Sequence, residues 1–217
     1  VKSVLLSMWE RVKGYIIKAG TIIFLSTIVI WFLMNFGDAG DGFGLLDADA
    51  PDYMDYSLMA GLGNLLAWIF APLGFDTWQA AATTITGLVA KENVVATVGI
   101  ITQLSSYGES DPALWLGFGQ MIGGGAAAIS AFCAFNLLCA PCFAAMGTIR
   151  QQQASAKWFW ITIGYLCGFA WCVGLMIYQF VGLATGEISF NFWTIIAIAV
   201  AAAMLFQIFR PMPKHKD

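Results

Sequence analysis

The chain has 217 residues, of which 59% are hydrophobic and only 11% are charged, and its formal net charge is -3. Soluble domains are about one-quarter charged residues, so this composition excludes a soluble globular protein and indicates an integral membrane protein. No basic patch occurs outside short segments beside the apolar runs, which excludes nucleic acid as a partner. The five cysteines all lie inside apolar runs between Cys133 and Cys172, which is not the pattern of a secreted disulfide framework.

The first predicted unit, residues 1–56, has a basic start and an acidic end. Residues 1–18 place apolar side chains at helical spacing among basic ones, which predicts a helix lying in the membrane interface. Residues 19–36 are uncharged and long enough to span a bilayer. Residues 37–55 hold six aspartates and no lysine or arginine. This order predicts a cytoplasmic N-terminus, because basic flanks stay inside.

The second predicted unit, residues 57–183, begins with two interrupted apolar segments. Residues 57–75 contain glycines and Pro72, and residues 77–102 contain a glycine and a charged pair. Neither segment is typical of a lipid-facing span, so we expect short or broken helices packed inside the protein, as at the midplane of transporters. After a polar loop we expect a short helix, a glycine triplet and a long helix, at residues 114–122, 123–125 and 126–149.

The long helix carries the sequence FCAFNLLCAPCFAAMGTIR. As one helix it places the sulfur atoms of Cys139, Cys142 and Met146 on one face. Pro141 lacks an N–H, so the carbonyl of Leu137 loses its helical partner and needs a protein group, water or an ion. Soft sulfur beside a freed carbonyl suits the path of a borderline cation. Small cysteines packed in a kinked membrane helix explain the same spacing, and spacing alone favours that explanation.

The charged pair Lys91 and Glu92 interrupts an apolar run, and ionisable groups at membrane depth are expected to be functional. Neighbouring side chains on a helix point about 100° apart, so each needs a partner elsewhere. We expect a backbone carbonyl for Lys91, and a cation, a helix N-terminus or a basic group for Glu92. The threonines up to Thr86 are expected to line a break at Gly87, and Asn93 completes the polar segment. The alternative is a helix end in a polar vestibule.

The remaining chain is expected to cross the membrane twice. Residues 150–157 form a short basic turn, and residues 158–183 span outward from it. The last unit, residues 184–217, contains an outer loop with Glu187, a span over 192–209 and a basic tail. Basic segments on one side and acidic loops on the other predict four full spans, two broken segments and cytoplasmic termini. The fold class is therefore an all-α, polytopic membrane helical bundle.

Three blocks of the sequence resemble a known family: GLVAKENVVATVG, FNLLCAPCFAAMGTIR and AKWFWITIGYLCGFAW. In this order they resemble the C-terminal membrane half of ferrous iron transport protein B, the Feo-type bacterial iron transporter. The leading segment SVLLSMWERVKGYIIKAGTIIF is also similar, so the resemblance omits only the acidic loop and the tail. It implies a gate-type (nucleoside-recognition-like) membrane bundle that imports Fe²⁺ across the bacterial inner membrane.

The resemblance also implies components beyond this chain. The family has an N-terminal G domain that binds and hydrolyses GTP with Mg²⁺, a first gate-type repeat, and a small cytoplasmic Feo-type accessory protein as a partner. We therefore expect no enzyme activity and no cofactor in this chain, Fe²⁺ as the transported ion, and the lipid bilayer around it; a homo-oligomer is left open. The family's pore cysteine after proline corresponds to Cys142, with Cys139 an additional thiol.

The candidate residues fall into two groups. The candidate metal ligands are Cys142, Cys139, Glu92, Asn136 and Met146. Gating or structural roles are expected for Pro141, Lys91, Asn93, Thr86 and Gly87. Two other classes compete with an iron path: a gate-type nucleoside or small-solute transporter, which a metal-insensitive cysteine pair would favour, and a non-transporting membrane scaffold, in which the charged residues all lie at interfaces.

Overall fold

Helices make up almost all of the part of the chain that the computed structural model describes. The described residues are 2–38, 42–47, 53–89, 91, 93–102, 111–123, 125–153 and 155–210. In chain order the elements are α1 (Lys2–Asn35), β1 (Phe36–Asp38), β2 (Phe43–Leu45), η1 (Tyr53–Tyr56), α2 (Leu58–Phe70), η2 (Ala71–Leu73), α3 (Trp78–Val89), α4 (Asn93–Ile101), α5 (Pro112–Met121), α6 (Ala126–Leu138), α7 (Phe143–Gln152), α8 (Ala156–Thr185) and α9 (Phe192–Phe209). The all-α fold class is confirmed, and the short antiparallel hairpin β1–β2 lies inside the predicted acidic loop.

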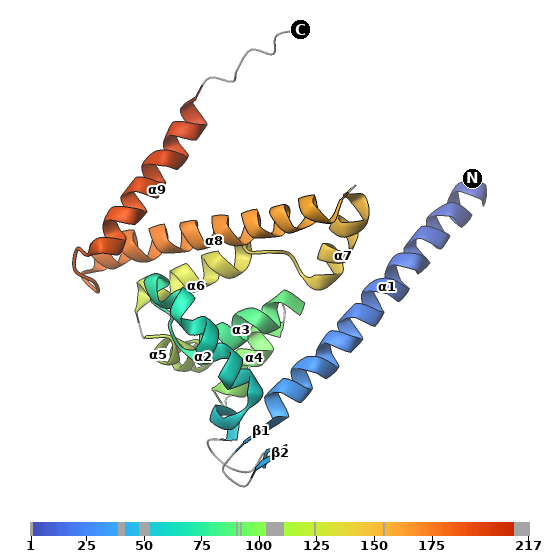
Figure 1. The fold of residues 1–217 in the computed structure, drawn as a ribbon, viewed down its shortest axis with the longest axis horizontal. Helices are drawn as coiled ribbons and strands as arrows, with labels where there is room; N and C mark the ends of the chain where they lie inside the picture. The colour runs from blue at the N-terminus through green and yellow to red at the C-terminus, as the bar shows by residue number, and fades with distance from the viewer. Residues whose placement is uncertain are drawn as a thin grey trace.

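A body of short helices lies between two helices that extend away from it. In Figure 1, α8 (orange) runs along α6 and α7, and α2 to α5 lie below it in the view. The helices α1 (blue) and α9 (red) project on opposite sides of this body. The long helix α8 is therefore the support against which α6 and the turn η2 pack.

Three helical segments of the described chain are long and apolar enough to cross a membrane: Ala126–Gln152, Ala156–Thr185 and Phe192–Phe209. A fourth crossing arises if Leu58–Leu73 and Trp78–Val89, a pair bent by 100° at its break, counts as one span. These lengths and compositions identify a multi-pass membrane protein. The bent pair also confirms the expectation of broken helices in this part of the chain.

The predicted interfacial helix and the predicted first span form one continuous helix, α1, of 34 residues. Its apolar part, Gly20–Asn35, is shorter than the other spanning segments. The described chain therefore has three segments that qualify as full spans, whereas the sequence predicts four. The two predicted segments form one helix because no proline separates them. The point at which the sequence changes from basic to apolar is therefore not a helix boundary.

The expected continuous helix over 126–149 is wrong. The helix α6 ends at Leu138, the backbone is extended at Cys139 (φ -62°, ψ 175°) and at Cys142 (φ -56°, ψ 157°), and α7 begins at Phe143. Pro141 causes this break, because its ring disfavours helical backbone in the preceding residue and it cannot donate a hydrogen bond.

The break also overturns the shared face of three sulfur atoms. Cys139 is the C-terminal cap of α6, and Cys142 is the N-terminal cap of α7. Met146 lies one turn inside α7, where its backbone N–H donates to the Cys142 carbonyl at 2.9 Å. The two thiols therefore belong to two different helix ends.

An aromatic cluster holds the body together. It consists of Phe70, Phe75, Phe118, Phe132 and Phe135, all buried, with ring centroids 5.0–6.2 Å apart in the contacting pairs. These rings come from the end of α2, the turn after η2, and the helices α5 and α6. Because edge-to-face and offset contacts fix ring orientation as well as distance, the cluster sets how the broken helices lie against α6.

The turn between α2 and α3 is fixed by two aromatic side chains of α8. The indole N–H of Trp171 donates to the Ile69 carbonyl at 2.9 Å, just before Pro72 in η2. Gly74 follows with a φ of 82°, and a Cβ atom built there would overlap the ring of Tyr178. The bend therefore requires glycine at this position, for its backbone angle and for the close ring.

We expect Gly74→Ala to lower the stability of the folded protein by about 1–3 kcal/mol, because the new methyl group meets both an unfavourable φ and the Tyr178 ring. Gly61→Ala is the matched control: Gly61 lies in α2, is exposed, and has nothing within 4 Å of the point where an added methyl group would lie. Thermal unfolding of the detergent-solubilised protein should show a lower Tm for Gly74→Ala only. Equal Tm values for the two variants would contradict a fixed bend.

Candidate functional site

Two helix breaks meet in the structure. One separates α3 from α4 and holds Lys91, and the other separates α6 from α7 after Leu138. The Lys91 ammonium donates to the Leu137 carbonyl at 2.9 Å. The sequence predicts that Lys91 needs a backbone carbonyl and that the Leu137 carbonyl needs a new partner. Both expectations are confirmed by this one contact, which joins residues 46 positions apart.

Gly87 and Asn136 lie where α3 crosses α6. A Cβ atom at Gly87 would lie 3.5 Å from Oδ1 of Asn136 and 2.7 Å from the Val94 side chain, so glycine permits this close approach. The Asn136 side-chain N–H donates to the Phe132 carbonyl at 2.9 Å, which holds the amide against α6. The Asn136 carboxamide is therefore positioned next to α3, one residue before the carbonyl that Lys91 occupies.

The two thiols beside the break differ in exposure. Cys139 is 8% exposed, and its thiol lies 3.5 Å from the Asn136 carbonyl oxygen and 3.7 Å from that of Ala140. Cys142 is half-buried. Lys91 reaches the same helix end through its contact with the Leu137 carbonyl. The break therefore combines thiols and backbone carbonyls with one ammonium group.

The candidate metal ligands do not form a complete cluster in the described part of the chain. Among the residues that the structure describes, no three His, Cys, Asp or Glu side chains gather closely enough to hold a metal ion. Glu92 lies outside the described residues, and Met146 is half-buried in α7. Asn93 is the first residue of α4 and is also half-buried. The described groups that converge are those of the two breaks.

A hydrogen bond between threonine side chains joins α3 to α4 across the break that separates them. The Thr97 hydroxyl donates to the Thr86 hydroxyl at 2.9 Å, and Thr86 donates to the Thr83 carbonyl at 2.9 Å. All three side chains are buried. In this conformation the hydroxyls are used within the protein and hold the two half-helices together.

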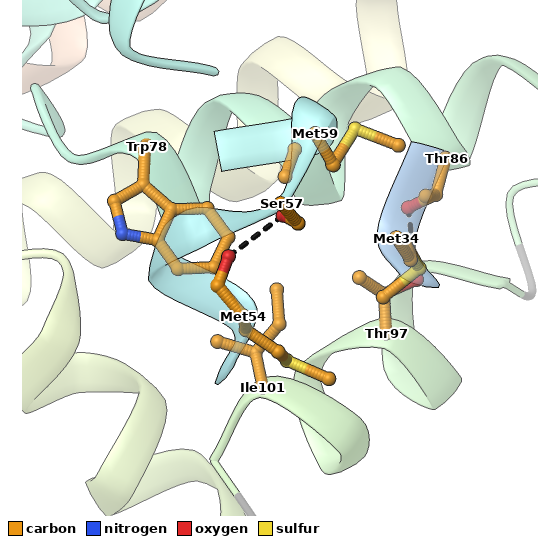
Figure 2. A pocket seen from close by; sticks show the side chains of 9 residues that line it. Met34, Met54, Ser57, Met59, Trp78, Thr86, Thr97 and Ile101 are labelled. Carbon is orange, nitrogen blue, oxygen red and sulfur yellow. Dashed lines mark hydrogen bonds between the residues drawn. The ribbon is translucent and has the colours of Figure 1, made fainter. Parts of the chain in front are cut away.

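A sulfur-rich pocket lies beside this threonine pair, and the sequence gives no indication of it. Figure 2 shows the thioethers of Met34, Met59 and Met54, which come from α1, α2 and η1. The space that they line is too small for a water-sized sphere. The Ser57 hydroxyl beside them donates to the Met54 carbonyl at 2.7 Å. We therefore interpret this pocket as the packed junction of α1 with the broken helices.

Glu187 caps the start of α6, a role that its place in a predicted outer loop does not reveal. Its two carboxylate oxygens accept from the backbone N–H groups of Ala126 at 3.0 Å and Ala127 at 3.2 Å. A Cβ atom at Gly125 would collide with this carboxylate, so glycine at this position permits the close contact. The contact lies at an open cleft of about 440 Å³ that Tyr178 also lines. A carboxylate here stabilises the positive end of the helix dipole.

Comparison with known proteins finds one matching family and several relatives of the chain. The family model described as "Gate: Nucleoside recognition" matches residues 16–155. The chain is 32% identical over 181 residues to the Fe(2+) transporter FeoB of Staphylococcus aureus strain COL, covering 82% of this chain and 24% of that protein. It is 33% identical over 176 residues to the Fe(2+) transporter FeoB of Methanocaldococcus jannaschii, covering 80% and 25%.

A third relative combines two proteins in one chain. The Fe(2+) transport protein A/Fe(2+) transporter FeoB fusion protein of Porphyromonas gingivalis is 29% identical over 217 residues, covering 82% of this chain and 25% of that protein. No solved structure matches the chain. The chain spans about a quarter of the length of these relatives.

Replacing Glu187 tests the cap on α6. We expect Glu187→Ala to destabilise the protein by about 1–3 kcal/mol, because two backbone N–H groups lose a charged acceptor. Glu187→Gln keeps one acceptor oxygen and should cost less. Hydrogen exchange at Ala126 and Ala127 should accelerate in the order wild type, Gln, Ala. Unchanged exchange in Glu187→Ala would contradict the cap.

Proposed function

The chain belongs to the nucleoside-recognition Gate family, and from this premise we propose that it forms part of a transporter that moves Fe²⁺ across the membrane. Its similarity to Fe(2+) transporters over four-fifths of its length supports the proposal. The structural observation that carries it is the meeting of two helix breaks, where the Lys91 ammonium lies on a backbone carbonyl of the helix end that also holds the Asn136 amide and the Cys139 thiol. Breaks of this kind form ion sites in many transporters, because unwound backbone exposes carbonyl oxygens.

The proposed ligands suit a cation that must bind and then leave. Fe²⁺ is borderline and accepts thiolate, carboxylate and carbonyl oxygen, while geometry and availability set selectivity. Transport requires a site weak enough to release its ion, so a few mixed ligands serve better than a closed thiolate cage. We propose Cys142 and Cys139 with the Asn136 side chain as the core of this set, and Met146 and Glu92 as further ligands.

We propose that the chain works within a longer protein. An N-terminal G domain would bind GTP with Mg²⁺ and couple its hydrolysis to transport, and a first gate-type repeat would complete the path. The whole would lie in the bacterial inner membrane with both ends of this chain in the cytoplasm. The name of the Porphyromonas gingivalis relative, a fusion with Fe(2+) transport protein A, supports a small Feo-type protein as a partner.

A second candidate is a gate-type transporter of nucleosides or other small solutes. The description of the matched family as nucleoside recognition favours it. The two candidates differ in their dependence on the thiols beside Pro141, since a nucleoside presents no soft cation to them. Uptake of Fe²⁺ and of a labelled nucleoside, measured in the same vesicles, separates the two.

In the intact transporter we expect Cys142→Ser to lower Fe²⁺ uptake by about tenfold or more, because a hydroxyl is a much poorer ligand than a thiolate for a borderline cation. Cys133→Ser is the matched control, since Cys133 is exposed on α6 away from the break. Uptake is measured in reconstituted vesicles with equal amounts of inserted protein. Undiminished Fe²⁺ uptake by Cys142→Ser would refute its role as a ligand, and thiol-independent nucleoside uptake would favour the second candidate.

We also expect Glu92→Gln to lower Fe²⁺ transport while GTP hydrolysis by the intact protein is retained, because the change removes a negative charge from the path and leaves the G domain untouched. Glu10→Gln is the control, since Glu10 is an exposed carboxylate of α1. Transport and hydrolysis are measured on the same preparation. Wild-type transport in Glu92→Gln would assign Glu92 a structural role.

A further inference from the structure

We infer that the Lys91 ammonium competes with the transported cation for the Leu137 carbonyl. The ammonium occupies this carbonyl in the structure, and it must leave before a metal ion can bind there. This rests on the proposed function and adds a residue that controls access to the site. The Leu137 carbonyl is free for such a contact because Pro141 cannot donate to it. The Lys91 Nζ atom lies 2.9 Å from that oxygen.

The position that the ammonium occupies attracts positive charge. Leu137 lies in the last turn of α6, where unpaired carbonyls carry the negative end of the helix dipole. The carbonyls of Asn136 and Ala140 lie nearby, each within 3.7 Å of the Cys139 sulfur. The ammonium therefore marks one carbonyl oxygen that accepts a cation, and it does so in the same helix end that holds the Cys139 thiol.

A divalent ion cannot share this position with the ammonium. Like charges a few ångströms apart repel by about 1 kcal/mol in water and several times more near a protein surface, and the repulsion doubles for a divalent ion. Lys91 in place therefore excludes Fe²⁺ from the Leu137 carbonyl. When Lys91 withdraws, it leaves behind a carbonyl that needs a new partner, and the arriving cation supplies one.

The ammonium is able to leave without disturbing the core. Lys91 is exposed, and its flexible four-carbon stem can swing away. Its backbone is part of the turn between α3 and α4, where the Val94 N–H donates to the Lys91 carbonyl at 3.2 Å. Movement of α4 therefore carries the ammonium with it, which links the position of this half-helix to access to the site.

A structural role for Lys91 requires only a hydrogen bond to the carbonyl, whereas competition requires the charge. Three substitutions separate the two roles. Lys91→Gln removes the charge and keeps an N–H donor, Lys91→Met removes both, and Lys91→Arg keeps both. Lys157→Gln is the control for charge, since Lys157 is an exposed lysine in the first turn of α8.

The experiment uses the intact transporter that contains this chain, reconstituted in vesicles that hold an Fe²⁺-sensitive dye, without GTP. We expect the passive Fe²⁺ leak to rise by about tenfold in both Lys91→Gln and Lys91→Met, because the repulsion by the ammonium is gone. The leak should stay near the wild-type value in Lys91→Arg and Lys157→Gln. The Tm of each variant shows that the fold is retained.

Two results would overturn the inference. A wild-type leak in Lys91→Gln, with a change in Lys91→Met alone, would show that only the hydrogen bond matters. A leak that rises equally in Lys91→Arg would show that charge is not what closes the site. Both results leave the proposed function intact as long as the wild-type protein takes up Fe²⁺ when GTP is supplied. Absence of that uptake would instead contradict the proposed function itself.

Discussion

Every interruption of a membrane helix leaves backbone groups that no water in the hydrocarbon region can satisfy, and the architecture of this protein follows from how those groups are bonded. The end of α2 receives the Trp171 indole at the Ile69 carbonyl. The end of α6 receives the Lys91 ammonium at Leu137, and the start of α6 receives the Glu187 carboxylate. Each partner comes from a distant part of the chain. These contacts therefore fix which broken helices lie together.

The charges of the two groups that contact α6 complement its dipole. A carboxylate lies at its N-terminus and an ammonium at its C-terminus, which is the arrangement that the helix dipole favours at each end. Such contacts strengthen as the local dielectric constant falls. The two helix ends are not held equally firmly. Glu187 accepts from two N–H groups at an open cleft, whereas Lys91 donates to a single carbonyl through a flexible stem. In our proposal, the C-terminal end of α6 is therefore the one that the transported cation takes over from Lys91.

The sequence predicts where the helices are interrupted, but it predicts less well the local geometry of each interruption. It predicts that Lys91 needs a carbonyl and that Pro141 frees one, because both follow from local rules on charge burial and proline. It cannot reveal that the helix stops at Leu138, since proline in a membrane helix is compatible with a kink as well as a full break. It also misses Glu187 as a cap, because the N–H groups that it bonds lie 60 residues earlier in the chain.

The broken helix suits a transport site better than the continuous helix that the sequence predicts. Sulfur atoms on one face of a rigid helix keep a constant separation, so a site built from them could tighten or loosen only by rotamer changes. Here Cys139 ends α6 and Cys142 begins α7, with extended backbone between them. Any shift of α7 relative to α6 therefore changes the separation of the two thiols. In the proposed Fe²⁺ path, thiols divided between two helix ends would provide a bound state and a released state with the same residues.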